Sequence, residues 1–395
     1  MKRILIIEDD QLVANIYRNK FVVDHFQVEL APDGEKGLEM ISIFRPDLVI
    51  LDLMLPKLTG IELLKHIRAQ SSLEHLPVIV LSNTYLSNIV QEAWKAGATK
   101  CLSKSNCTPK QVVDVVKVVL TQPHSDSPAA GSGTDPASSK PAQKESDGDA
   151  AFQAELRASF MAVLPGTLGA LRTLLQGITK GSDETTRLRQ LEELYRKVHT
   201  LTGNAGIAGM LQIAQIADAF EVLLKELFEK PKSVNASTLR TVAMAIDFLG
   251  TLFDRAQQPD ARVFQEATDA AILVVDDEAI SRRAVTYALE KGKLQAVSLE
   301  DPLAALQVLS EKSFDLIFLD VDMPGMSGFE LCTKLRAFPA HKKTPVIFVT
   351  SLTDFESRAN STMSGGNDLI AKPFLFIELT VKALIFLLRG RLAGK

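Results

Sequence analysis

The 395-residue chain has little cysteine and no basic segment. Its three cysteines, Cys101, Cys107 and Cys332, are odd in number and show no C-x-x-C spacing. This argues against a disulfide framework or a zinc site and favours a reducing compartment. Formal net charge is −4, made up of 0 over 1–121, −3 over 122–150, 0 over 151–260 and −1 over 261–395. Because a nucleic-acid-binding module needs a cationic surface to neutralise phosphates, we expect no nucleic-acid partner.

Segments that direct a chain to a membrane are missing as well. The apolar run 4–7 is cut short by three acids at 8–10, so it does not read as a signal peptide. The uncharged stretch 198–217 is about long enough for a membrane span, but it contains several polar side chains and three glycines. We therefore expect a cytoplasmic protein without a membrane partner.

Residues 122–150 lack Val, Ile, Leu, Met and every aromatic residue. Such a segment cannot bury enough apolar surface to offset its conformational entropy, which predicts a flexible linker with a span of roughly 30 Å. At roughly 150 residues per domain, a chain of this length is expected to contain two or three domains. We place them at 1–121, 151–258 and 270–390.

The two outer segments repeat each other without a gap. Six residues with special chemistry recur at a constant offset of 268 positions, and this offset predicts two copies of one domain. The pairs are Asp9 and Asp277, Asp52 and Asp320, Pro56 and Pro324, Gly60 and Gly328, Ser82 and Thr350, and Lys104 and Lys372.

Each copy alternates short apolar runs with amphipathic stretches. In the first copy the runs 3–7, 48–51 and 78–81 are continuously apolar, as strands covered on both faces of a parallel sheet must be. Amphipathic segments between them predict helices, so each copy reads as a doubly wound α/β domain. In 151–258, apolar residues instead recur at steps of three and four, which predicts an all-α bundle of four or five helices with a break at Pro165.

Acidic side chains stand at the predicted carboxyl ends of the strands, where ligands of such sheets gather. The acids are Glu8, Asp9 and Asp52 in the first copy and Asp276, Asp277 and Asp320 in the second. Two like charges about 4 Å apart cost on the order of 4 kcal/mol at an effective dielectric near 20, so each cluster needs a cation. An all-oxygen ligand set predicts Mg²⁺. An aspartate beside Mg²⁺ and a lysine could then attack phosphorus and become an aspartyl phosphate.

Several segments resemble the receiver domains of two-component response regulators. They are ILIIEDD, LVILDLMLPKLTG and VIVLSN in the first copy and ILVVDDE, LIFLDVDMPGMSG, IFVTS and AKP in the second. The resemblance implies a flavodoxin-like fold and phosphorylation at Asp52 and Asp320. It further implies the backbone carbonyls of Met54 and Asp322 as additional metal ligands, Ser82 and Thr350 as switch residues, and Lys104 and Lys372 as charge partners.

The resemblance is incomplete in the first copy. The family's Lys-Pro pair, usually joined by a cis bond, is kept at Lys372 and Pro373, but Lys104 is followed by Ser105. A rival interpretation of the second copy is the D-x-D motif of haloacid-dehalogenase-type phosphatases, with Asp320 and Asp322 as its acids. We disfavour it because the other copy has Met54 at the second acidic position.

One histidine lies in an interpretable pattern. His199 stands beside the apolar stripe of a predicted helix over 184–202, and following glycines would leave its ring uncovered. The run HTLTGNAGIAG resembles the histidine phosphotransfer (HPt) domain, whose pattern is His-x-Leu-Lys-Gly. Thr202 stands in place of the lysine, and Arg196 could substitute from the preceding turn. The remaining histidines are expected on the surface: His25, His66, His75, His124 and His341.

These patterns predict a receiver, HPt, receiver protein of a phosphorelay. No ATP-binding kinase motif is found, so we expect a phosphotransfer protein rather than an enzyme with its own kinase activity, acting downstream of a separate histidine kinase. The expected partners are that kinase and other phosphorelay proteins, and homo-oligomers are compatible with the composition. The linker favours docking of Asp52 onto His199. The alternative is a phosphorylation-gated interaction scaffold whose bundle is inert.

Overall fold

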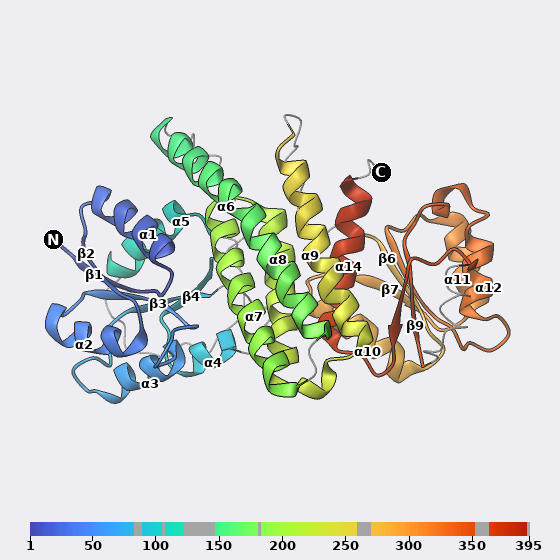
Figure 1. Cartoon of the computed structure of the whole chain (residues 1–395), viewed down its shortest axis with the longest axis horizontal. Helices are drawn as coiled ribbons and strands as arrows, with labels where there is room; N and C mark the ends of the chain where they lie inside the picture. The colour runs from blue at the N-terminus through green and yellow to red at the C-terminus, as the bar shows by residue number, and fades with distance from the viewer. Residues whose placement is uncertain are drawn as a thin grey trace. The chain divides into compact units, whose positions relative to one another are not determined.

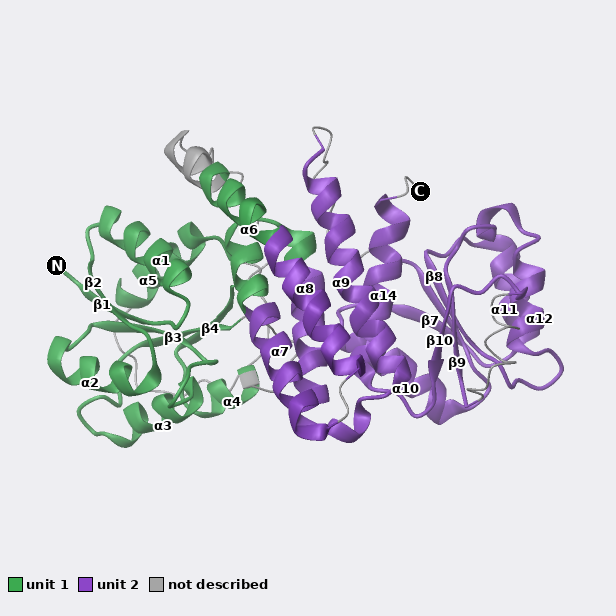
Figure 2. Ribbon diagram, viewed as in Figure 1, with its two compact units in different colours: residues 1–164, 200–214 green, residues 165–199, 215–395 purple. Residues whose placement is uncertain are grey.

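A computed structural model describes residues 1–82, 89–104, 107–121, 147–180, 183–258, 270–351 and 363–392 (Figure 1). The chain divides into two compact units, which Figure 2 shows in different colours. Unit 1 comprises 1–164 and 200–214, and unit 2 comprises 165–199 and 215–395.

The first unit contains a five-stranded parallel sheet of order β2-β1-β3-β4-β5. Its strands are β1 (Arg3–Ile7), β2 (Gln27–Ala31), β3 (Leu48–Asp52), β4 (Val78–Ser82) and β5 (Lys100–Ser103). The helices that alternate with them are α1 (Gln11–Val23), α2 (Gly34–Phe44), α3 (Gly60–Ala69), α4 (Ile89–Lys95) and α5 (Pro109–Thr121). The predicted doubly wound fold is confirmed, because separate apolar clusters fill the two faces of the sheet.

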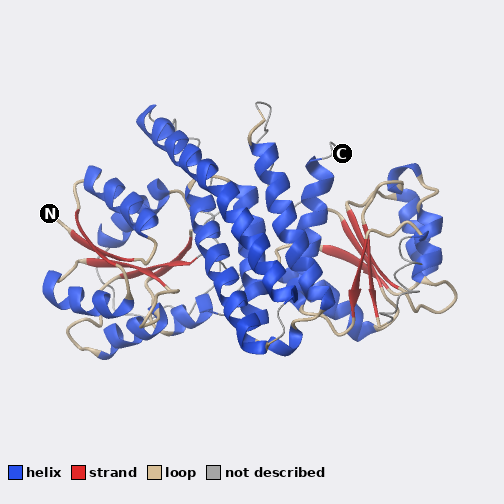
Figure 3. Cartoon of the chain, in the orientation of Figure 1, coloured by secondary structure: helices blue, strands red, loops and turns tan. Residues whose placement is uncertain are grey.

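The second unit contains the matching sheet, of order β10-β9-β8-β6-β7 and again parallel (Figure 3). Its strands are β6 (Ile272–Val275), β7 (Ala296–Leu299), β8 (Leu316–Asp320), β9 (Val346–Thr350) and β10 (Asp368–Ala371). Its helices are α10 (Ala279–Lys291), α11 (Pro302–Glu311), α12 (Gly328–Leu335) and α14 (Phe376–Leu392), with a 3₁₀ turn η4 (Pro339–His341). In both sheets the central strands are buried along their whole length, which explains their continuously apolar sequences.

Local sequence determines where the loops at the carboxyl edges turn into helices. Asp10 caps α1 by accepting hydrogen bonds from the backbone N–H groups of Leu12 and Val13. Thr59 and Glu62 form a reciprocal capping box at the start of α3. Because such caps satisfy the first backbone donors of a helix, they define the points at which the loops after β1 and β3 end.

Four α-helices form the middle of the described chain, as the apolar spacing predicted: α6 (Asp147–Lys180), α7 (Glu184–Ile207), α8 (Leu211–Glu229) and α9 (Ala236–Ala256). The short 3₁₀ turn η2 (Pro231–Ser233) joins α8 to α9. Helix α6 begins inside the predicted linker. Once a helix has formed, each further residue adds a backbone hydrogen bond, so the helix can extend past the residues whose side chains pack in the bundle. The rest of that linker, 122–146, lies outside the described residues.

The predicted break at Pro165 is wrong, since α6 continues through this residue. A proline in a helix interior costs about 3 kcal/mol. Leu164, Leu168 and Leu171 on the same helix are at most 3% exposed. Burying each contributes roughly 2 kcal/mol, which outweighs the lost hydrogen bond.

The expectation for the histidines is confirmed at His25, His66 and His75, which are exposed, and wrong at His341. The His341 ring is fully buried, with Nδ1 3.2 Å from Thr344 Oγ1 and Nε2 2.9 Å from the carbonyl oxygen of Lys312. These bonds satisfy both ring nitrogens and allow the burial. His124 lies outside the described residues.

Two helices are long and apolar enough to cross a membrane by length and composition alone. They are the part 154–180 of α6 and the whole of α9, and the apolar windows are 22% and 50% buried. This is weak evidence for a span, because the core helix of a soluble protein passes the same test. Neither helix includes the stretch 198–217.

Candidate functional site

The first acidic cluster forms where the sequence placed it. Glu8 and Asp9 follow β1, and Asp52 is the last residue of β3. One carboxylate oxygen of each lies within 4.8 Å of the others. Neighbouring parallel strands end at one edge, which brings acids together that are distant in sequence.

Lys104 joins two of these acids. Its Nζ lies 2.6 Å from Glu8 Oε2 and 2.7 Å from Asp52 Oδ2, and all three side chains are at most 3% exposed. Burial raises the pKa of Glu8 to about 8, although Lys104 opposes this shift. Burial alone would lower the pKa of Lys104, but the charges of Asp52 and Glu8 raise it above its ordinary value. The buried lysine therefore stays cationic and compensates part of the negative charge.

The second cluster repeats this geometry with more access to solvent. Carboxylate oxygens of Asp276, Asp277 and Asp320 lie within 4.8 Å of one another. Lys372 Nζ lies 3.0 Å from both Asp276 Oδ2 and Asp320 Oδ1, and its side chain is 16% exposed. Asp276 also accepts a hydrogen bond from Ser281 Oγ. Burial raises the pKa of Asp320, while Lys372 opposes the shift.

The predicted switch residues lie at the same edges. Ser82 and Thr350 are the last residues of β4 and β9, and both are buried. Their carbonyl oxygens accept from the backbone N–H groups of Lys104 and Lys372, each at 2.8 Å. The backbone of each predicted switch residue is thus hydrogen-bonded to the backbone of the lysine in its own cluster. The Lys372–Pro373 bond is cis, as the family resemblance implied, and Ser105 lies outside the described residues.

The two residues expected to offer backbone carbonyls occupy the loops that follow Asp52 and Asp320. The N–H group of Met54 donates to Asp52 Oδ1 at 3.2 Å. The Asp322 side chain is exposed. Among the described residues, the acidic cluster of the second sheet consists of Asp276, Asp277 and Asp320 and does not include Asp322. This arrangement gives the phosphatase interpretation no support, since the second acid of D-x-D does not join the first.

Each cluster has the donor chemistry of a hard divalent cation. Three carboxylates face one ammonium group, so negative charge remains when the acids are ionised. Mg²⁺ prefers such oxygen ligands and usually keeps waters that a phosphoryl oxygen can replace. The residues present therefore fit Mg²⁺ in both sheets.

His199 lies in α7, which runs past the predicted end at 202 to Ile207. Its Nδ1 is 2.8 Å from Oε1 of Glu221 on α8, and the two side chains are 14% and 4% exposed. The ring is therefore less open than predicted, because Glu221 holds it against α8. Because an ionised carboxylate only accepts hydrogen bonds, this contact assigns the proton of a neutral ring to Nδ1 and its lone pair to Nε2.

Sequence reasoning missed Glu221. The available signal was an acid directly after Phe220 within the apolar stripe of α8. Of the other candidates, Arg196 pairs with Glu192 at 2.7 Å on the exposed face of α7, and Thr202 is fully buried.

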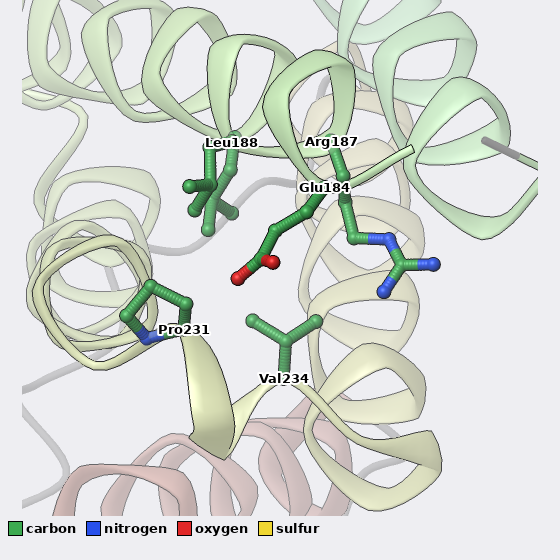
Figure 4. A pocket seen from close by; sticks show the side chains of 6 residues that line it. Glu184, Arg187, Leu188, Pro231 and Val234 are labelled. Carbon is green, nitrogen blue, oxygen red and sulfur yellow. The ribbon is translucent and has the colours of Figure 1, made fainter. Parts of the chain in front are cut away.

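A pocket of about 210 Å³ opens at the start of α7 (Figure 4). Leu188, Leu191, Pro231 and Val234 form its apolar lining, and Glu184 and Arg187 contribute opposite charges. At a rise of 1.5 Å per residue, the α7 residues of this pocket lie roughly 12 to 22 Å along the helix from His199. The pocket therefore does not belong to the histidine site.

Two curated proteins are similar to part of this chain. The chain is 37% identical over 122 residues to the transcriptional regulatory protein ResD of Bacillus subtilis, covering 30% of this chain and 50% of ResD. It is 33% identical over 120 residues to the protein RcaC of Microchaete diplosiphon, covering 30% and 18%. The chain thus spans half or less of these curated relatives.

A solved structure, the chemotaxis protein CheY4 of Vibrio cholerae, is 31% identical with a TM-score of 0.28, covering 29% of this chain and 95% of that one. The family model of the response regulator receiver domain matches 4–117 and 272–384, more than half of the chain, and the Hpt domain model matches 155–259. The chain therefore belongs to the response regulator receiver family, with an HPt domain between its two receiver domains.

Proposed function

We propose that this two-component protein passes phosphoryl groups between the receiver aspartates Asp52 and Asp320 and the HPt histidine His199, downstream of a separate histidine kinase. The observation that carries the proposal is the pairing of Asp52 and Asp320 with a lysine at a carboxylate cluster, Lys104 being buried and Lys372 partly buried. An oriented histidine in the HPt region supplies the third group.

Apart from Mg²⁺, the reacting groups come from this chain and a phosphorylated donor. A carboxylate oxygen of Asp52 attacks the donor's phosphorus, an O–P bond forms, and the donor N–P bond breaks with its electron pair left on nitrogen. Lys104 donates to Asp52 Oδ2, and its ammonium group would neutralise charge that accumulates on the phosphoryl oxygens. When bound, Mg²⁺ supplies neutralisation of phosphoryl oxygens at the cluster. In onward transfer, His199 Nε2 attacks phosphorus and the Asp52 carboxylate is restored, while Glu221 stabilises the cationic ring.

Contacts within unit 1 support exchange between the first receiver and the histidine helix. Ile207 and Leu156 join the apolar cluster of α1 and α5. Ile207 ends the helix that bears His199, about two turns further along. We infer that the first receiver is the one that serves His199 within the chain.

The wider assignment follows from this role. We propose a cytoplasmic phosphotransfer protein without catalytic kinase activity, with Mg²⁺ as its cofactor and with a histidine kinase and other phosphorelay proteins as partners. We propose neither a nucleic-acid nor a membrane partner, and homo-oligomers remain compatible with it.

A second candidate is a phosphorylation-gated scaffold with an inert bundle. Thr202 favours it, because this residue replaces the lysine of the HPt pattern and is fully buried. Arg196, the proposed substitute, is paired with Glu192.

Timed phosphotransfer from a labelled histidine kinase separates the two candidates. We expect Asp52→Asn to abolish label on His199, and His199→Gln to leave label on Asp52 alone. Phosphohistidine survives base whereas acyl phosphate does not, so lability identifies each species. An Asp320→Ala chain that carries label on Asp52 and none on His199 would contradict the relay and favour the scaffold.

A further inference from the structure

The last helices of the two receivers differ in what covers them. Helix α5 buries one stripe, formed by Pro109, Val112, Val113, Val116 and Val119, and exposes the other side. Helix α14 occupies the matching position at the offset of 268, yet every residue from 377 to 388 is buried. A helix that packs only on its own sheet leaves one face in solvent, so α14 has a second partner.

The second partner is α9 of the HPt region, in the same unit. The two helices lie side by side in Figure 1, and both belong to unit 2 in Figure 2. Ser237 Oγ and Thr241 Oγ1 donate hydrogen bonds to Glu378 Oε1 at 2.7 and 3.0 Å. At the other end of the contact, the Arg389 guanidinium lies 5.4 Å from the centre of the Phe248 ring.

Sequence differences between the copies match this contact. The first receiver has Lys110, Gln111 and Lys117 on the exposed face of α5. The second has Glu378, Leu379 and Ile385 at the same offsets, all at most 2% exposed. Replacing solvated side chains with buried ones on one face is what a lasting docking surface requires.

The Glu378 carboxylate makes the contact selective. A buried carboxylate costs free energy unless it is hydrogen-bonded, and both described donors to Glu378 come from α9. Separation of the helices would leave the acid without them. The contact therefore holds one register rather than sliding along an apolar surface.

The docked helix also begins next to the phosphorylation site. Lys372 binds Asp320 at 3.0 Å and directly follows β10, and α14 starts at Phe376. A phosphoryl group on Asp320 gives Lys372 a new anionic partner at the base of α14. Glu378 lies in the first turn of that helix.

We propose that α14 and α9 form a cis docking surface locked by Glu378, through which the state of Asp320 reaches the HPt domain. The second receiver then acts on the bundle as a bound regulator, while the first exchanges phosphoryl groups with His199. The docking itself is independent of the proposed function, and only the signal from Asp320 rests on it.

Hydrogen exchange with mass spectrometry on the full chain tests the docking. Glu378→Lys introduces the residue type of the first receiver, and we expect exchange in 236–256 to become about tenfold faster or more, because two hydrogen bonds to a buried charge are lost. Lys110→Glu, the matched change in α5, should leave 236–256 unchanged, and Glu378→Gln should stay near the wild type. Ser237→Ala with Thr241→Val tests the same bonds from α9. Unchanged exchange in 236–256 for Glu378→Lys, or equal acceleration by Lys110→Glu, would overturn the docking surface.

Unchanged exchange in the strands β6 and β8 of the variant shows that the second receiver is still folded. If those strands also exchange faster, the double variant in α9 decides the question, since its substitutions lie outside the receiver.

The signal is tested in an Asp52→Asn chain treated with acetyl phosphate. We expect phosphorylation of Asp320 to change exchange in 236–256 at least about threefold, and Glu378→Lys to remove this response. Phosphorylated Asp320 without any change in 236–256 overturns the signal. An Asp320 that never takes up a phosphoryl group refutes the proposed function and the signal together, whereas the docking result stands by itself.

Discussion

His199 Nδ1 lies 2.8 Å from Glu221 Oε1, and this pair joins α7 to its neighbour α8. The carboxylate accepts the Nδ1 proton, so the neutral ring presents its lone pair at Nε2. It also faces the positive charge that the ring gains when Nε2 binds phosphorus. Glu221 is thus a positioning residue for the proposed transfer.

Replacement of Glu221 by glutamine should slow phosphorylation of His199 by about a hundredfold or more, since an amide can donate to Nδ1 and select the wrong tautomer. Initial rates of label transfer from Asp52 measure the effect, and nitrogen NMR of the ring reports the tautomer. Glu192→Gln, on the exposed face of α7, serves as the control. A full rate in Glu221→Gln would show that the carboxylate only fills space.

Lys104 should be essential to the stability of the first receiver. Lys104→Ala leaves Glu8 and Asp52 buried without their cation, which costs about 3–5 kcal/mol. The fluorescence of Trp94, the single tryptophan of the chain, follows urea unfolding of this domain within the intact protein. Lys57→Ala removes a lysine that is 57% exposed and should cost far less, because solvent screens its ion pair with Asp33. Equal losses in the two variants would refute a special role for Lys104.

The pKa of Glu8 predicts how this receiver responds to pH without a divalent cation. Burial raises it from 4.5 to about 8. Between these values the folded state binds a proton that the unfolded state has released, so the free energy of unfolding falls as pH rises, by at most about 1.4 kcal/mol per pH unit. Urea unfolding in a chelator, followed by Trp94, measures the slope. Glu8→Gln should flatten it, and a wild-type stability that rises through this range would contradict the assignment.

The carboxylate clusters were predictable because of a simple rule of geometry. Acids that follow buried parallel strands must meet at one edge, so Asp9, Asp52 and their repeats required only the apolar runs and the offset. The partner of His199 was not predictable in this way. Its identity depends on how α7 and α8 rotate against each other, and no local spacing connects 199 with 221.

Packing also decided two other outcomes. Proline usually breaks a helix, as expected at Pro165, and histidine is usually exposed to solvent, as expected at His341. In α6, burial of the leucines outweighs the cost of Pro165. Hydrogen bonds to Thr344 and Lys312 satisfy the ring nitrogens of His341 and allow it to be buried. A sequence pattern gives the local preference but not the tertiary contact that overrides it.

Tyr17 offers a stabilising substitution. Its side chain is fully buried in the apolar cluster of α1 and α5, and Oη has no hydrogen-bond partner in the described part of the chain. Tyr17→Phe removes a desolvated hydroxyl and keeps the ring, so the first receiver should gain about 1 kcal/mol. Trp94 fluorescence during urea unfolding checks this value. A loss of stability would show that the hydroxyl has a partner in solution.

Gly60 and Gly328 lie where an added side chain would strike the backbone of Asp52 and of Asp320, respectively. A Cβ on Gly60 would lie 2.2 Å from the carbonyl oxygen of Asp52, and one on Gly328 would lie 2.0 Å from that of Asp320. Backbone at this distance must move, so alanine should cost about 1–3 kcal/mol and displace the carboxylate from its lysine.

Phosphorylation by acetyl phosphate should therefore slow at Asp52 in Gly60→Ala and at Asp320 in Gly328→Ala, each without an effect on the other receiver. Gly166→Ala is the matched control, because an added Cβ meets nothing within 4 Å in the exposed interior of α6. There the same substitution should stabilise the helix by about 1 kcal/mol. If Gly60→Ala kept both its stability and its rate of phosphorylation, the loop after β3 would be flexible enough to accommodate the added Cβ. The fixed position of Asp52 beside Lys104 would then not determine the reactivity of Asp52.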